Sequence, residues 1–433
     1  MKRNAYFSVI LLGLTILILA NCADNKDRKI YKLQKIKNVD GFTSINGYKV
    51  EKGKFYFTGI KNDEWDLYSL DLGDQSLANY HQNIESYDLY IALKDKRAIY
   101  IDLDSNLYYR KEGGDVKIDD GITGFNRPNL LISPSQDAIL YTKKQDQTIG
   151  LYIYDLQEGQ SLLVREGLSK EALKNFTFTS QWSKKGNYFI YNNEEIYNRG
   201  GQLQTRIQAT ASQWSPDDKY IVFIKKPGIL QENKIIIGDW ETYIGHELGL
   251  LHLPSQKEEI IYNSPPGLID PIDNIQWSKS GKHVGISFGT ILKSPHNELE
   301  GMDYQGVYIY DINGARGVEV GGLAYNYYEI LFDNYLYASY LGKKSDLEII
   351  SIYGDRRWKY KRPVLLNSQD MFVISSDQIA YFVDDNRLMQ ILPGGQIQQV
   401  IKFPWQINEL YFDEGSGKII ITTGDMEIYL LTP

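Results

Sequence analysis

The stretch that decides the fold reads Gln213-Trp214-Ser215-Pro216-Asp217-Asp218-Lys219-Tyr220-Ile221-Val222-Phe223. It has the pattern of a strand ending in Trp-Ser, a tight turn, and a second strand with a nearly continuous apolar run. Trp-Ser, a turn and an apolar strand recur after Gln181 and after Gln276, and a fainter copy follows Leu131. A hairpin repeated in this way predicts a repeat architecture, in which the hairpin itself is structural.

From about residue 30 onward, short apolar segments alternate with turn signals, which is typical of an all-β chain. The repeat is near 40 residues long and holds four strands, here called a to d. A second recurring signature is Tyr-Asp followed by a turn, at Tyr154-Asp155 and Tyr310-Asp311. These units resemble the TolB-like and WD-repeat β-propellers. The resemblance implies a single β-propeller of four-stranded antiparallel blades over residues 30–433.

The number of blades follows less directly from the sequence. Nine a–b hairpins can be counted, but the length left after two insertions suits eight or nine units of roughly 40–45 residues. We expect eight blades, with seven to nine allowed. The last unit, from Asn408, lacks strand d, whereas the extended segment Lys29–Ile36 has no partner of its own. We therefore expect the N-terminal strand to complete the last blade and so close the propeller.

The N-terminus has the features of an export signal. Lys2 and Arg3 precede a mostly apolar run, Tyr6–Ala20, which is short for a membrane-spanning helix. The run ends in Leu19-Ala20-Asn21-Cys22, which resembles the lipobox of bacterial lipoproteins. The resemblance implies a signal peptide over residues 1–21 and lipidation at Cys22. Asn21 departs from the small residue that usually precedes the cysteine, which bears on the efficiency of cleavage.

Two models of attachment remain open. In the first, Cys22 carries the lipid and residues 22–29 form a polar tether; in the second, the apolar run stays as an uncleaved signal anchor. Both place the body on the outer side of a bacterial cytoplasmic membrane. Cys22 is the only cysteine, so no intramolecular disulfide is possible. The net charge of −8 argues against nucleic acid as a partner.

One face of the expected propeller collects the enlarged connections. The b–c and d–a connections share this face, and it receives the insertions Pro227–His246 and Thr290–Gln305. The links Arg165–Thr179, with a possible helical turn over Ser169–Asn175, and Asn263–Asp273 belong to it too. Long loops on a rigid scaffold are common binding sites. The candidate binding residues in these loops are Trp240, Glu241, Tyr243, His246, Asp270, His296, Glu298 and Asp303.

This acidic and aromatic mixture suits a peptide, a glycan or a protein partner. The alternative is that the loops are decoration that packs on neighbouring blades. Signals for catalysis are weak. Gly285-Ile286-Ser287-Phe288-Gly289 matches a nucleophile elbow, but it lies in an expected strand with no helix after it. The five His are scattered, we expect no metal or other cofactor, and we expect Asp384 and Asp385 to be solvated in a turn.

The sequence therefore favours a membrane-anchored, non-enzymatic binding or scaffold module for an envelope protein, peptide or polysaccharide. A first alternative is an enzyme acting on glycans or peptides at the central channel, which requires inward carboxylates about 5–9 Å apart. A second is a sensor or assembly subunit of an envelope complex. These hypotheses rest on the fold, and propellers host many functions.

Overall fold

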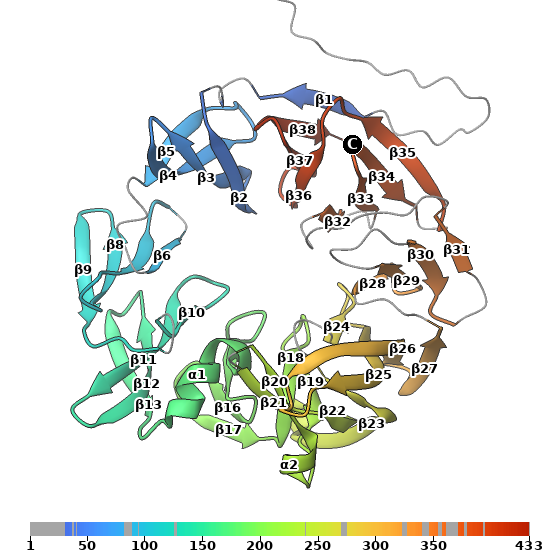
Figure 1. Ribbon diagram of the computed structural model, residues 1–433. Coiled ribbons are helices and arrows are strands. Elements are labelled where there is room, and N and C mark those ends of the chain that lie inside the picture. Colours follow the sequence, from blue (N-terminus) through green and yellow to red (C-terminus); the bar gives the residue numbers. More distant parts are fainter. Residues whose placement is uncertain are drawn as a thin grey trace, which may run out of the picture. The chain divides into compact units, whose positions relative to one another are not determined.

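The computed structural model describes residues 31–36, 39, 41–81, 89–93, 95–124, 128–238, 240–269, 275–322, 327–339, 346–353, 357–360, 371–375, 379–392 and 395–432. Within these residues the chain forms nine four-stranded antiparallel sheets, the blades of a β-propeller (Figure 1). Two compact units can be distinguished, residues 1–83 with 367–433 and residues 84–366, and each is described by itself.

The preferred count of eight blades was therefore one too low, although nine lies within the expected range. The count of eight rested on an average repeat length. Blade four is much shorter than that average, since its four strands occupy only residues 181–206. This compact blade leaves enough chain for a ninth sheet.

The unit of residues 1–83 and 367–433 holds three blades. Blade one consists of β2 (Ser44–Glu51), β3 (Lys54–Lys61), β4 (Glu64–Asp71) and β5 (Leu77–His81). Blade eight consists of β32 (Phe372–Ile374), β33 (Ala380–Asp384), β34 (Arg387–Ile391) and β35 (Ile397–Lys402). Blade nine consists of β36 (Ile407–Asp413), β37 (Lys418–Thr423), β38 (Ile428–Thr432) and β1 (Lys32–Lys35).

The N-terminal strand completes the last blade, as expected. β1 pairs antiparallel with β38, in a register that places Lys32 opposite Thr432 and Lys35 opposite Tyr429. The N–H of Ile36 adds a hydrogen bond of 2.9 Å to the carbonyl of Ile428. β1 therefore covers an edge of β38 that would otherwise expose unpaired backbone groups.

The unit of residues 84–366 holds six blades. Blade two consists of β6 (Leu89–Ala92), β7 (Ala98–Ile101), β8 (Leu107–Lys111) and β9 (Gly114–Asp119). Blade three consists of β10 (Leu130–Ile132), β11 (Ala138–Gln145), β12 (Thr148–Asp155) and β13 (Gln160–Arg165). Blade four consists of β14 (Gln181–Trp182), β15 (Tyr188–Tyr191), β16 (Glu195–Asn198) and β17 (Leu203–Arg206). Blade five consists of β18 (Ala209–Trp214), β19 (Tyr220–Lys225), β22 (Gly245–His252) and β23 (Lys257–Leu268). Blade six consists of β24 (Ile275–Trp277), β25 (His283–Lys293), β26 (Leu299–Asp311) and β27 (Arg316–Gly321). Blade seven consists of β28 (Tyr327–Leu331), β29 (Tyr335–Ser339), β30 (Glu348–Ser351) and β31 (Arg357–Lys359).

The recurring Trp-Ser turn is held by the serine. In blade five the N–H of Ser215 donates to the carbonyl of Tyr220 at 2.9 Å, and the Ser215 hydroxyl accepts the N–H of Tyr220 at 2.9 Å. Asp218 takes the left-handed conformation that closes the turn, with φ 66°. Ser183 and Ser278 make the same pair of bonds, and their turns also contain a left-handed residue. The Trp-Ser motif that recurs in the sequence therefore forms a structural turn.

The tryptophan of this hairpin packs between blades. Trp214 of blade five is fully buried, and its ring stacks on Tyr188 of blade four at 6.0 Å and 15°. The next turn residue joins the same two blades, because the Asp218 carboxylate accepts the Ser183 hydroxyl at 2.7 Å and the Lys185 N–H at 3.1 Å. The apolar core of the unit is made of such clusters between successive sheets, for example between blades five and six.

Residues 1–30, with the predicted signal peptide and Cys22, lie outside the described residues. In the part of the chain that the structure describes, no helix has the length and apolar character needed to span a membrane.

Candidate functional site

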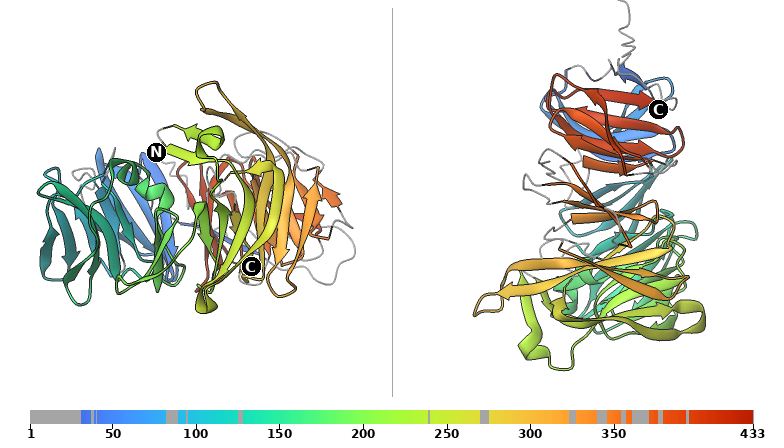
Figure 2. Two further views of the ribbon diagram at one scale, coloured as in Figure 1. Left: turned by 90° about the horizontal axis from the view of Figure 1, so that it is seen from below. Right: turned by 90° about the vertical axis from the view of Figure 1, so that its right-hand side faces the viewer.

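The two insertions fold as hairpins rather than as open loops. The first, between β19 and β22 of blade five, contains the short helix α2 (Leu230–Asn233) and the paired strands β20 (Lys234–Ile237) and β21 (Trp240–Tyr243). The second prolongs β25 and β26 of blade six, which stay paired out to Lys293 and Leu299. In the right-hand view of Figure 2 both inserts extend beyond the blades on the same side.

Direct hydrogen bonds join the two inserts. The N–H of Ile236 in β20 donates to the carbonyl of Asn297 at 2.7 Å, and Ile236 forms a parallel β-bridge with Glu298. The Lys293 ammonium at the end of β25 donates to the carbonyl of Glu232 in α2 at 2.8 Å. We call this joined structure, residues 227–238, 240–244 and 290–305, the insert platform.

The insert platform has a small apolar core of its own. Ile235, Ile244 and Ile269 are buried together, and partly buried side chains from both inserts pack on them: Ile237, Ile291, Leu299 and Met302. Between blades five and six Tyr262 stacks on Tyr308 at 3.9 Å, and the Tyr308 hydroxyl donates to the carbonyl of Ile261 at 2.6 Å. Burial, reinforced by nearby negative groups, raises the pKa of Tyr308 to about 12, so the hydroxyl keeps its proton at neutral pH.

A helix from the link between blades three and four supports the platform. α1 (Lys170–Thr179) confirms the helical turn expected at Ser169–Asn175 and extends it, with the Ser169 hydroxyl capping the N–H of Ala172 at 3.1 Å. Near its C-terminus Phe178 stacks on Trp240 of β21 at 5.4 Å and 18°. Because Ile269 of the fourth connection lies in the platform core, contacts link all four enlarged connections.

The predicted binding residues on β21 and β22 are buried or half-buried. Trp240 is only 6% exposed, beneath Phe178, and Glu241 pairs with Lys234 at 2.6 Å. Tyr243 and His246 are half-buried, and Nδ1 of His246 lies 3.0 Å from the carbonyl of Ser264.

The predicted residues of the second insert face solvent. His296 and Glu298 lie at the turn between β25 and β26, where the Ser294 hydroxyl accepts both of their N–H groups, and Asp303 is exposed on β26. Asp270 lies outside the described residues. The structure thus brings Glu298 against β20 of the first insert, whereas His296 and Asp303 stay at the surface.

Other exposed residues of the platform were not predicted from the sequence as binding residues. Ile229 is 61% exposed, Leu230 36% and Leu292 48%, and the carboxylates of Glu232 and Glu300 are exposed beside them. An apolar pair directly after Pro-Gly inside an insertion was a usable signal for Ile229 and Leu230. Leu292 gave no signal, because its position reads as an ordinary strand residue.

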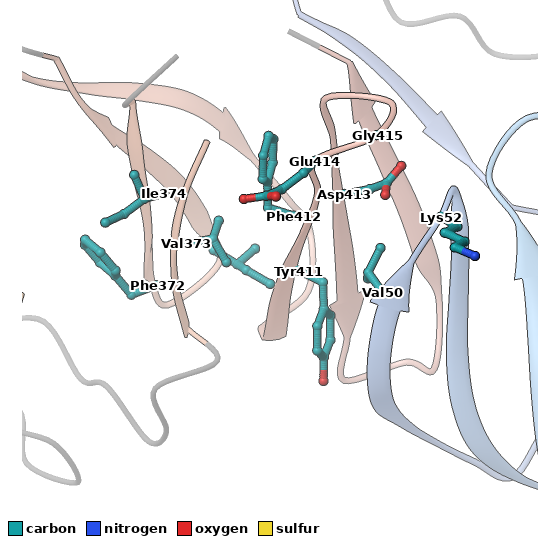
Figure 3. A pocket seen from close by; sticks show the side chains of 11 residues that line it. Val50, Lys52, Phe372, Val373, Ile374, Tyr411, Phe412, Asp413, Glu414 and Gly415 are labelled. Carbon is teal, nitrogen blue, oxygen red and sulfur yellow. The ribbon is translucent and has the colours of Figure 1, made fainter. Parts of the chain in front are cut away.

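The unit of blades one, eight and nine contains an open cavity of about 590 Å³. It is lined by β2, β32 and β36 and the turns that follow β2 and β36 (Figure 3). Its two carboxylates, Asp413 and Glu414, point in different directions. The Asp413 carboxylate accepts the N–H groups of Gly53 at 3.3 Å and Ser416 at 2.9 Å, so it serves the turns. These two groups do not form the convergent pair that glycoside hydrolysis requires.

Other candidate chemical groups are structural where they are described. Ser287 of the Gly-x-Ser-x-Gly match is fully buried inside the continuous strand β25, as expected. Asp385 is exposed, but the expectation of a solvated Asp384 was wrong: Asp384 is the last residue of β33, is 2% exposed and forms an ion pair with Arg387, which lies opposite it in β34. Among the described residues no group of three or more His, Cys, Asp or Glu side chains could hold a metal ion.

No protein family and no curated protein matches the sequence. Solved structures with a similar fold include an oligogalacturonate lyase from Vibrio parahaemolyticus, the C-terminal WD40 domain of Sif2, and TolB from Acinetobacter baumannii. Each is 11% identical over 93% of this chain, with 93%, 98% and 80% of the other chain covered and TM-scores of 0.40, 0.43 and 0.30. At these values the likeness carries no information about function. By its own strand order, the described chain is a nine-bladed β-propeller.

Proposed function

We propose that this protein is a membrane-anchored, extracytoplasmic β-propeller lipoprotein that acts as a non-enzymatic binding or scaffold module for an envelope protein, peptide or glycan. The insert platform is the observation that carries this proposal. Insertions from two consecutive blades meet on one side, share hydrogen bonds, and bury a common apolar cluster. A surface built in this way presents its exposed side chains in a fixed geometry, which lowers the entropy lost on binding.

The lipid anchor is part of the proposal and has its own support in the sequence. Residues 23–29 between Cys22 and the body are polar and span at most roughly 25 Å when extended. Lipid chains at Cys22 therefore hold the body close to the membrane surface. Two or more acyl chains give stable attachment, at about 0.8 kcal/mol for each buried CH₂.

The binding role is tested by deleting the first insert. Residues 227–244 are replaced by a two-residue turn between Lys226 and Gly245, and partners are crosslinked and purified from intact membranes. We expect the blades to keep their fold by circular dichroism and the partner to be lost. The control variant Leu162→Ser/Leu163→Ser changes exposed residues of β13 instead. If the deletion variant still binds the same partner, the platform is not the binding site.

The anchor is tested separately by Cys22→Ser with metabolic labelling by a fatty-acid analogue. We expect the variant to lose the label. It should then either be cleaved and leave the membrane fraction, or remain as the uncleaved precursor. Retention of the label by the variant would exclude lipidation at this position. Co-purification of a defined multi-protein complex with the wild type would favour the sensor or assembly role over simple ligand binding.

A further inference from the structure

Three aliphatic side chains of the insert platform are exposed. Ile229 and Leu230 begin the first insert, and Leu292 lies near the end of β25. Leu292 lies on the same face of the β25–β26 hairpin as Asp303, because Leu292 pairs with Gly301 and Thr290 with Asp303, whereas Ile291 and Met302 pack on the apolar cluster at the opposite face. Exposed aliphatic groups held on an ordered support are typical of interaction sites.

The charge of this surface is one-sided. Residues 227–233 and 290–305 contain four carboxylates but a single ammonium group, that of Lys293. The four carboxylates, Glu232, Glu298, Glu300 and Asp303, are all exposed. Among the described residues none of the four forms an ion pair, whereas the lysines nearer the blades are paired, Lys234 with Glu241 and Lys225 with Glu247.

We infer that the platform binds a basic protein surface, in which an apolar recess framed by Lys and Arg receives Leu292. This inference rests on the proposed binding function and specifies its partner. The uncompensated carboxylates repel anionic lipid headgroups and anionic polysaccharides. Complementary charge at the rim speeds association, while the aliphatic contacts at the centre slow dissociation.

The experiment begins with identification of the partner. A photo-crosslinking amino acid is placed at Leu292 of the full-length lipoprotein in intact cells, and the crosslinked peptide is sequenced. The partner is then purified, and its affinity for the lipoprotein is measured at low and high salt. The test variant is Glu298→Lys/Glu300→Lys/Asp303→Lys. The matched control, Glu112→Lys/Glu158→Lys/Glu258→Lys, makes the same change in net charge at exposed positions elsewhere.

We expect the crosslinked segment to be rich in Lys and Arg, and the test variant to bind at least about tenfold more weakly with a flatter salt dependence. The control should change the affinity less than about twofold. Leu292→Ser should weaken binding by accelerating dissociation. An equal loss in test and control variants would show non-specific attraction and overturn the inference.

Other outcomes overturn this inference without touching the proposed function. If a crosslinked partner binds the charge-reversed variant with the same affinity as the wild type, the platform remains a binding face but the partner surface is not basic. Binding of the wild type, in preference to the charge-reversed variant, to phosphatidylglycerol vesicles or to an anionic polysaccharide would do the same. Absence of any crosslink from Leu292 together with an unchanged partner list in the insert deletion would reject both.

Discussion

At the scale of single residues, buried hydroxyl groups replace missing backbone partners in the a–b turns. Ser215 is fully buried, accepts the N–H of Tyr220, and donates to the Asp217 carboxylate at 2.7 Å. Removal of this oxygen leaves a donor without a partner, which costs more than the net value of the bond. The Ser residue recurs because each turn needs the same acceptor.

We predict that Ser215→Ala lowers the free energy of unfolding by about 1–3 kcal/mol, measured by urea denaturation. The control is Ser416→Ala, since Ser416 is exposed and only its backbone N–H donates a recorded bond, to Asp413. Similar losses in the two variants would contradict a special role for the buried hydroxyl.

Glu195 is a second residue whose surroundings have a measurable consequence. It is 6% exposed and accepts bonds from Tyr197 at 2.7 Å and Arg206 at 3.1 Å, and it forms an ion pair with Arg165. Burial acts to raise the pKa of Glu195, but the bonds from Arg165, Tyr197 and Arg206 outweigh it and hold the pKa below its ordinary value of about 4.5.

A lowered pKa links this carboxylate to stability. The contribution of Glu195 is fully present above pH 4.5 and is lost as the pH falls through its folded-state pKa. We predict that Glu195→Gln is less stable than the wild type at pH 7 and that the difference shrinks below pH 4.5. The measurement is urea unfolding across the pH range. A difference that stays constant with pH would show that the carboxylate does not act through its charge.

At the scale of elements, the insert platform packs on itself as well as on the blades. Its core is the cluster around Ile235, and β20 has ladder contacts only with β21 and the Glu298 bridge among the described residues. Such a substructure can open without unfolding of the blades.

We predict that Ile235→Ser opens the platform locally. Ile235 is fully buried, and an unpaired hydroxyl in an apolar cluster disfavours the closed state. Hydrogen exchange should accelerate in β20 and β21 at least about tenfold, as expected for more than 1.4 kcal/mol of local destabilisation, with little change in β18 and β19. The control Ile237→Ser changes a partly buried position of the same strand. Uniform acceleration across blade five would mean that the insert and the blade unfold together.

At the scale of the whole molecule, the two ends of the chain share one sheet. β1 is short and polar, and it carries lysines at both ends, Lys32 and Lys35. Charged, short edge strands discourage pairing with other molecules. The strand β38 that it covers is almost entirely buried. The N-terminal segment therefore connects the expected membrane tether to the closing sheet.

We predict that a chain lacking residues 1–35 loses about 2–4 kcal/mol of unfolding free energy relative to one lacking residues 1–29, since the β1 ladder bonds disappear. The exposed edge of β38 should also promote self-association, visible by sedimentation. Both chains lack the anchor, so the comparison isolates β1. Equal stability and equal sedimentation would show that β1 does not contribute to closure.

The sequence by itself determined the features that depend on local chemistry. The Trp-Ser hairpin, the antiparallel blades and the N-terminal strand of the last sheet follow from strand patterns and turn residues that act over a few positions. The position of the insertions was also readable, because they interrupt a repeat of regular length.

Only the tertiary structure decided what the insertions do and how many blades there are. The bond between Ile236 and Asn297 and the burial of Trp240 under Phe178 depend on segments far apart in the chain. Local pattern does not encode which side chains such segments cover. The ninth blade depended on the compactness of blade four, which average repeat length conceals. The sequence thus placed the candidate binding face, and packing between blades selected which of its side chains remain exposed to a partner.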